Sequence, residues 1–141
     1  MKKLVKLSLV SLLVLTSCSD VMIEDHIEGS WKLVTYLRND VDETSELTIA
    51  DYEETYMLDG TFSRSYISGK QISVEESGEF SIDEDNSQIM ISGVSSIADF
   101  SERNSTISTS TVDIVVIDEG EYAYSFENGG DVHEFWFIRQ E

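Results

Sequence analysis

The amino-acid sequence predicts an all-β domain, in which an antiparallel up-and-down meander of about eight strands closes into a barrel. Short runs of alternating apolar and polar residues recur along the chain, and turn sequences rich in Gly, Asp and Asn separate them. Nowhere do ten residues follow a helical period with capping residues, and the sequence allows a helical turn only in the segment before Gly29 or near 97–100. A β-sandwich is the alternative with the same local pattern, but the barrel is favoured because closure removes exposed strand edges.

Tight turns join the predicted strands. Asp59-Gly60 is a strong hairpin signal within 51–68, because both residue types tolerate positive φ. The chain contains no proline, which is consistent with well-paired strands. The other predicted runs are 30–38, 77–93 with a turn at 83–87, and 110–140 with turns at Glu119-Gly120 and Asn128-Gly129-Gly130, while 95–104 is the one long connection.

The first 17 residues, MKKLVKLSLVSLLVLTS, have the features of a secretory signal peptide. Three lysines precede an apolar stretch over 7–15, which is shorter than the roughly 20 residues of a membrane-spanning helix. The sequence Leu15-Thr16-Ser17-Cys18 resembles the lipobox of bacterial lipoproteins. This resemblance implies that the Cys18 thiol is diacylglycerylated, that cleavage occurs before it, and that the new amine is open to acylation, for example with palmitate. An ordinary secreted protein with an incidental cysteine is the alternative.

Acidic residues dominate the chain after this presequence. The first 17 residues hold three of the nine Lys and Arg residues and none of the 28 Asp and Glu residues. The remaining 124 residues therefore carry a net charge of −22 with histidine neutral. This charge opposes binding to nucleic acid and to anionic lipid, whereas it favours solubility and permits a cationic protein partner. A single cysteine excludes an internal disulfide.

These features divide the chain into three segments. We predict a lipoprotein signal peptide over 1–17, the lipidated Cys18 with a short acidic tether over 18–28, and one barrel domain over 29–141. The expected location is the cell envelope of a Gram-negative bacterium, with the outer membrane favoured over the inner membrane. The apolar tether residues available to dock on the domain are Val21, Met22, Ile23 and Ile27.

Four short motifs point to a known family: GSW at 29–31, MLDGTF at 57–62, SGEFSID at 77–83 and the arginine of FWFIRQ at position 139. The first motif matches the G-x-W that opens the first strand of lipocalins and of bacterial lipocalin-like lipoproteins. MLDGTF resembles the F-x-x-D-G-T-F hairpin of those bacterial domains, and SGEFSID is similar to their G-x-Y-x-I strand. Residues 21–141 therefore resemble the lipocalin-like domain of bacterial envelope lipoproteins, which implies a closed barrel.

The resemblance implies a shared position for Gly29, Trp31 and Arg139 at the closed end of the barrel. The first and last strands must pair if the barrel closes, and this pairing brings Trp31 and Arg139 together. A guanidinium over an indole contributes about 0.5–2 kcal/mol, depending on desolvation. Gly29 would let the chain pass close to the barrel floor without a Cβ. We interpret these three residues as structural rather than as ligand contacts.

Patterns for catalysis and metal binding are weak. His26 lies in the tether and His133 in the last strand, and neither has a cysteine nucleophile available. The stretch HEFWF at 133–137 lacks the second histidine of H-E-x-x-H. The acidic run 83–87 lacks the Gly and Glu that an EF-hand loop requires at its sixth and twelfth positions. We therefore expect no enzyme activity, no metal site and no cofactor.

Aromatic residues at spacing two within the runs are the most suggestive feature. An eight-stranded barrel can be filled by its own side chains or can hold one small ligand. We hypothesise that the protein binds a small apolar or amphipathic ligand in the barrel mouth, with Tyr56, Tyr66, Tyr124 and Phe126 as lining residues. The alternative is an acidic protein-interaction module with a side-chain-filled barrel, which binds or inhibits a cationic partner or has an assembly role.

Overall fold

The computed structural model describes residues 22–94 and 111–141. The predicted signal peptide, Cys18 and the predicted connection 95–104 lie outside these residues. The described elements, in chain order, are α1 (Ile23–Ile27), β1 (Gly29–Arg38), β2 (Val41–Asp42), the 3-10 helix η1 (Thr44–Glu46), β3 (Ala50–Tyr56), β4 (Thr61–Ile67), β5 (Ser73–Asp83), β6 (Gln88–Ser92), β7 (Thr111–Ile117), β8 (Glu121–Asn128) and β9 (Asp131–Arg139).

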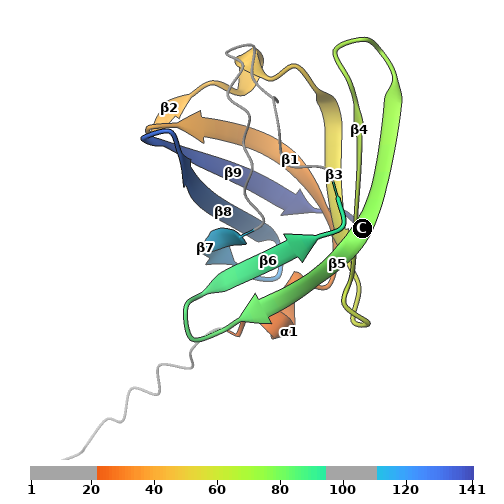
Figure 1. Ribbon diagram of the computed structural model, residues 1–141, viewed down its shortest axis with the longest axis vertical. Helices are drawn as coiled ribbons and strands as arrows, with labels where there is room; N and C mark the ends of the chain where they lie inside the picture. The colour runs from red at the N-terminus through yellow and green to blue at the C-terminus, as the bar shows by residue number, and fades with distance from the viewer. Residues whose placement is uncertain (1–21, 95–110) are drawn as a thin grey trace, which may run out of the picture.

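The strands form one antiparallel sheet that closes on itself (Figure 1). Each strand from β3 to β8 pairs with the next along the chain, and β1 pairs with both β3 and β9. The closing pair begins with Trp31 opposite Arg139 and ends with Arg38 opposite His133. The two-residue β2 adds only a short pairing to the end of β1. The predicted all-β, up-and-down barrel is therefore confirmed, with eight strands in the closed sheet.

Glycines allow the turns of the two hairpins that carry the strongest signals. Gly60, with φ of 86°, ends the turn between β3 and β4. Asp59 does not share this conformation; its carboxylate instead accepts a hydrogen bond of 2.9 Å from the backbone N–H of Thr61. Gly129 and Gly130, with φ of 61° and 88°, form the two-residue connection between β8 and β9. Both hairpins occur where the sequence predicts them.

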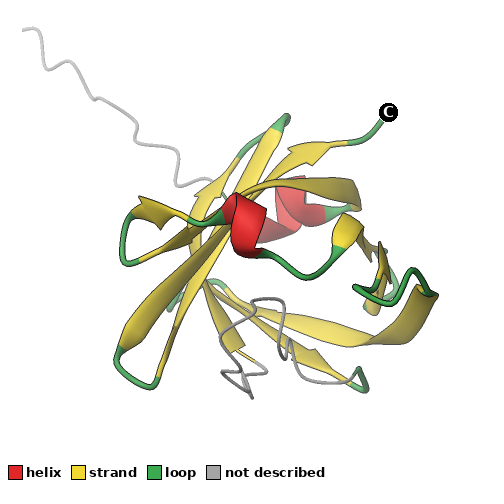
Figure 2. Cartoon of the chain, turned by 90° about the horizontal axis from the view of Figure 1, so that it is seen from above, coloured by secondary structure: helices red, strands yellow, loops and turns green. Residues whose placement is uncertain are grey.

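The barrel has two unlike ends, which we call the α1 end and the η1 end. At the α1 end, at the bottom of Figure 1, lie α1 and the β3–β4, β5–β6 and β7–β8 turns. At the η1 end lie η1 and the β4–β5 and β8–β9 turns. Figure 2 shows the molecule from above, with both helical elements seen against the surrounding strands.

Helix α1 belongs to the folded core, although it lies in the segment predicted as a tether. Ile23 and Ile27 are only 3% and 2% exposed and pack with the barrel interior. The carboxylate of Glu84 accepts hydrogen bonds from the backbone N–H groups of Ile23 (3.1 Å) and Glu24 (2.9 Å). The folded part therefore begins before Gly29. A five-residue helix is too short to show a period in the sequence.

The side chains that face inward form three walls of different chemistry. The aromatic wall, on β8 and β9, consists of Tyr122, Tyr124, Phe126, His133, Phe135 and Phe137. The polar wall, on β3, β4 and β5, consists of Tyr52, Glu54, Arg64, Tyr66 and Glu76. The aliphatic wall, on β6 and β7, consists of Ile89, Ile91, Val112 and Ile114. The barrel interior is thus neither uniformly apolar nor uniformly polar.

Candidate functional site

Arg139 closes the α1 end of the barrel. Its guanidinium lies over the ring of Trp31, 4.2 Å from the ring centroid. It also donates hydrogen bonds to three backbone carbonyl oxygens, those of His26 (2.7 Å), Glu28 (2.6 Å) and Glu119 (2.6 Å). One side chain at the end of the last strand therefore ties together α1, the start of β1 and the β7–β8 turn.

Gly29 and Trp31 complete this arrangement. A Cβ on Gly29 would lie 2.5 Å from Nη1 of Arg139, and the φ of Gly29 is 122°. Trp31 is fully buried, and its indole N–H donates a 2.8 Å hydrogen bond to the carbonyl of Ile27. The three residues predicted at this end therefore lie together. The polar side-chain groups of Trp31 and Arg139 are hydrogen-bonded to protein atoms, so these residues stabilise the fold.

Glu54 lies in the middle of the polar wall and is fully buried. The hydroxyls of Tyr52 and Tyr124 donate to its Oε1 over 2.7 and 2.9 Å, and the hydroxyl of Tyr56 donates to its Oε2 over 2.7 Å. Burial raises the pKa of Glu54 above its usual value, and the three phenol hydrogen bonds offset only part of this rise. Three donors satisfy this carboxylate, and the bond from Tyr124 links β3 to β8 across the interior.

Arg64 continues the polar wall on β4, opposite Glu54 in the strand pairing. Its side chain is 1% exposed, and its Nε and Nη2 both lie 2.6 Å from Oε2 of Glu76 on β5. Its charge also favours the ionised form of Glu54. The order of charges across the three strands is therefore negative, positive, negative. Alternating signs lower the cost of burying each group.

His133 lies near the η1 end and is fully buried. Its Nδ1 is 2.8 Å from the hydroxyl of Tyr36, and its ring stacks on Phe126 with centroids 5.2 Å apart. Arg38 lies directly across the β1–β9 pairing and is hydrogen-bonded to Asp131 on the same strand as His133. Burial, and then the charge of Arg38, lowers the pKa of His133. The imidazole is therefore neutral at pH 7.

A series of ring contacts connects the two ends of the barrel. It runs from the buried indole at the α1 end to the imidazole at the η1 end, with neighbouring centroids 5.2 to 5.8 Å apart. The rings, in order, are Trp31, Tyr122, Phe137, Tyr124, Phe135, Phe126 and His133. Such contacts stabilise the packing of the aromatic wall.

The four predicted lining residues lie on three strands, β3, β4 and β8, and differ in burial. Tyr56 and Tyr124 are fully buried and meet through Glu54. Phe126 lies further toward the η1 end and is 4% exposed. Tyr66 is partly buried on the polar wall, with its ring 6.0 Å from that of Tyr52. All four contribute to the barrel interior.

Sequence reasoning missed the buried polar groups. The alternation Tyr52-x-Glu54-x-Tyr56 contains a signal for Glu54, because it places the carboxylate on the same face as two aromatic rings. His133 alternates in the same way with Phe135 and Phe137 in the last strand. An acidic residue in a half-polar strand is normally assigned to the solvent face, and this chain has 28 of them.

The two histidines lie at opposite ends of the barrel, His26 in α1 and His133 near the η1 end. Among residues 22–94 and 111–141, no group of three or more His, Cys, Asp or Glu side chains is arranged to hold a metal ion. The acidic run 83–87 is a turn in which the Asp83 carboxylate accepts hydrogen bonds from the backbone and side-chain N–H groups of Asn86.

In the described part of the chain, no helix is long and apolar enough to cross a membrane.

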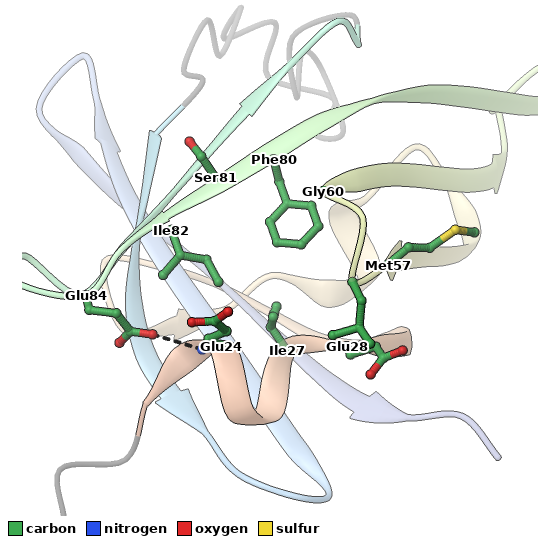
Figure 3. A pocket seen from close by; sticks show the side chains of 10 residues that line it. Glu24, Ile27, Glu28, Met57, Gly60, Phe80, Ser81, Ile82 and Glu84 are labelled. Atoms are coloured by element: carbon green, nitrogen blue, oxygen red, sulfur yellow. Dashed lines mark hydrogen bonds between the residues drawn. The ribbon is translucent and has the colours of Figure 1, made fainter.

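A groove of 280 Å³ lies beside α1, between the helix, the β3–β4 turn and the end of β5 (Figure 3). In Figure 3 the side chains of Ile27, Phe80 and Ile82 point into a shared space. Leu58, which is 79% exposed, also lines the groove. Three carboxylates complete the lining, those of Glu24, Glu28 and Glu84. The groove thus combines an apolar floor with negative charge.

Comparisons with known proteins identify similar folds. No protein-family model matches the chain, and no curated protein matches it. A crystal structure of a lipocalin-like protein from Bacteroides uniformis ATCC 8492 covers 81% of this chain and 98% of its own, with a TM-score of 0.56 and 16% identity. Japanin from Rhipicephalus appendiculatus, bound to cholesterol, covers 79% of this chain and 74% of its own, with a TM-score of 0.53 and 7% identity. The barrel is therefore lipocalin-like in fold.

Proposed function

We propose that the protein binds one small apolar or amphipathic molecule in its barrel, as a lipid-anchored lipoprotein of the cell envelope, and that it catalyses no reaction. One observation supports ligand binding most directly: the barrel interior combines an aromatic wall with buried polar side chains. Small-molecule sites are mostly apolar, with a few placed polar groups that orient the ligand. The similar fold of japanin, whose structure contains cholesterol, agrees with this proposal.

Anchoring at the outer membrane rests on the sequence. The short apolar stretch, the lipobox-like residues and the single Cys18 support lipidation together. Two or three acyl chains would anchor the protein firmly, because each buried CH₂ contributes about 0.8 kcal/mol. Mass spectrometry of the protein recovered from bacterial membranes tests this step. Lipidation would be contradicted if the protein with Cys18 carried no added acyl mass and the Cys18→Ser variant stayed equally in the membrane fraction.

Native mass spectrometry tests ligand binding. We expect residues 19–141, incubated with a lipid extract from the envelope, to show a discrete mass shift that disappears on denaturation. The variant Tyr124→Ala opens the aromatic wall and removes one donor to Glu54, so it should weaken the adduct. Glu127, which is exposed on the same strand, provides a control in Glu127→Gln. An unmodified mass under every condition would overturn the ligand hypothesis.

The groove beside α1 favours a second candidate function, binding of a basic amphipathic segment of another protein. Its apolar floor and its three carboxylates complement such a partner in both hydrophobicity and charge. A synthetic amphipathic peptide of leucine and lysine is a suitable probe for calorimetry. Leu58→Ser should weaken its binding, whereas Val41→Ser, at a similarly exposed apolar residue of the η1 end, should not. Equal binding by both variants would reduce the interaction to non-specific charge attraction.

A further inference from the structure

We infer that the η1 end of the barrel binds an uncharged oxygen acceptor, such as that of an alcohol, ketone or ester, through Nε2 of His133 and Nη1 of Arg38. This inference rests on the proposed function and specifies the polar group of the ligand. Two buried nitrogens on adjacent strands support this inference. Within residues 22–94 and 111–141, neither nitrogen has an acceptor in hydrogen-bond range.

The two nitrogens belong to residues that are paired in the fold. Arg38 on β1 and His133 on β9 are direct partners in the closing pair, so their side chains emerge on the same face. Phe126, the partner of His133 on β8, supplies a ring beside them. Two hydrogen-bonding groups next to an aromatic surface suit a molecule with one polar group and an apolar body.

Both nitrogens present a proton. A guanidinium nitrogen is always a donor. Nδ1 of His133 lies 2.8 Å from the hydroxyl of Tyr36, and we assign the phenol as the donor because it is a stronger acid than a neutral imidazole N–H. The single ring proton of the neutral imidazole then resides on Nε2. The site therefore offers two N–H donors, and its ligand must offer an acceptor.

The surrounding charges select against an anion. The positive charge of Arg38 is already paired with Asp131, and Glu43 also acts electrostatically on both Arg38 and His133. One cation therefore stands among two carboxylates, in a protein whose net charge is strongly negative. A carboxylate or phosphate ligand would meet repulsion here, whereas a neutral oxygen would not. An unmet buried donor costs free energy, which an acceptor recovers on binding.

Three probes of one chain length test this inference: 1-dodecanol, dodecanoate and dodecane. The protein is expressed from the full 141-residue sequence, purified as the cell processes it, and titrated with each probe by native mass spectrometry. We expect 1-dodecanol to bind about tenfold more tightly than either of the others, as one or two hydrogen bonds predict. In ¹⁵N NMR spectra, 1-dodecanol should shift the Nε2 signal of His133 and leave the signals of His26 unchanged.

Variants separate the hydrogen bond from the shape of the site. His133→Phe should abolish the preference for 1-dodecanol and leave dodecane binding unchanged, and His133→Gln, which keeps an N–H donor, should restore part of it. His26→Phe, at the opposite end of the barrel, is the matched control and should retain the full preference. If His133→Phe misfolds, the His133 Nε2 shift in the native protein decides the question alone.

The outcomes distinguish two failures. If all three probes bind equally and His133→Phe changes nothing, the inferred acceptor site is overturned, whereas the proposed binding of a ligand in the barrel is retained. Tightest binding of dodecanoate would overturn the assignment of an uncharged group. If none of the probes binds, the proposed function fails, and this inference fails with it.

Discussion

The two ends of the barrel differ in how their polar groups are paired. At the α1 end, the guanidinium of Arg139 and the indole N–H of Trp31 all reach backbone carbonyls. At the η1 end, Nε2 of His133 and Nη1 of Arg38 have no acceptor among the described residues. The bonded polar groups of the α1 end stabilise the fold. At the η1 end, buried donors without such an acceptor cost free energy, which is typical of a binding site.

Trp31→Ala should produce the largest loss of stability. The ring is fully buried, contacts Tyr122 and lies under Arg139, and its N–H is bonded to Ile27. We expect the free energy of unfolding to fall by about 3–5 kcal/mol, as for other buried aromatic residues. Chemical denaturation measures this change. A loss below about 1 kcal/mol would contradict the assignment of this end as the stable one.

Glu54→Ala tests the region between the two ends. Without the carboxylate, the hydroxyls of Tyr52, Tyr56 and Tyr124 lose their shared acceptor inside the barrel. Such a loss should cost about 2–4 kcal/mol. Glu54→Gln keeps an acceptor oxygen and should cost less than half as much. Equal losses in thermal unfolding for both variants would show that the charge of Glu54, rather than its hydrogen bonds, stabilises the interior.

Gly29→Ala should have a smaller effect at the same end as Trp31. The added Cβ would lie 2.5 Å from Nη1 of Arg139, in a backbone conformation with φ of 122°. We expect a loss of about 1–3 kcal/mol, because the methyl group both strains the backbone and displaces the guanidinium. In the background of Arg139→Ala the steric part should disappear. A double-mutant cycle in urea measures the coupling between the two substitutions. If their losses of stability are additive, the contact between the new Cβ and Arg139 does not cause the loss.

His133→Phe should have the smallest effect on stability at pH 7, about 1 kcal/mol, because removing the unpaired Nε2 offsets much of the lost hydrogen bond between Nδ1 and the Tyr36 hydroxyl. Its effect should appear in the pH dependence. In the unfolded chain the imidazole takes up a proton near its usual pKa of about 6.5, whereas the folded protein resists this protonation. The unfolded state therefore binds more protons as the pH falls below about 6.5, and stability falls.

Denaturation curves between pH 7.5 and pH 5 measure this slope. It is at most about 1.4 kcal/mol per pH unit for one group, and it should be reduced in His133→Phe. The charged groups that act on this imidazole, Arg38, Asp131 and Glu43, are all present in both proteins, so their own contributions cancel in the comparison. An identical slope in the variant would show that His133 does not resist protonation.

The sequence predicts the frame of this molecule better than its interior. Alternation and turn residues such as Gly60 and Gly129 locate strands, because they depend only on neighbours along the chain. The partnership of Trp31 and Arg139 follows from closure of the barrel. The meeting of Glu54 with Tyr124 does not, because their contact depends on the width of the barrel and the stagger of its strands. For the α1 segment the sequence indicates no more than a single helical turn in the tether, because five residues are too few to show a helical period.

The position of α1 has a geometric consequence for the proposed lipoprotein. The chain reaches the barrel at Met22, beside the end that Arg139 closes, and Cys18 precedes it by only four residues. Four residues span at most about 14 Å. An acyl anchor on Cys18 would therefore hold the α1 end of the barrel against the bilayer, with His133 and Arg38 directed toward the aqueous compartment. Cargo would then arrive by way of that compartment or from a facing protein, and transfer to the supporting membrane would require the barrel to tilt.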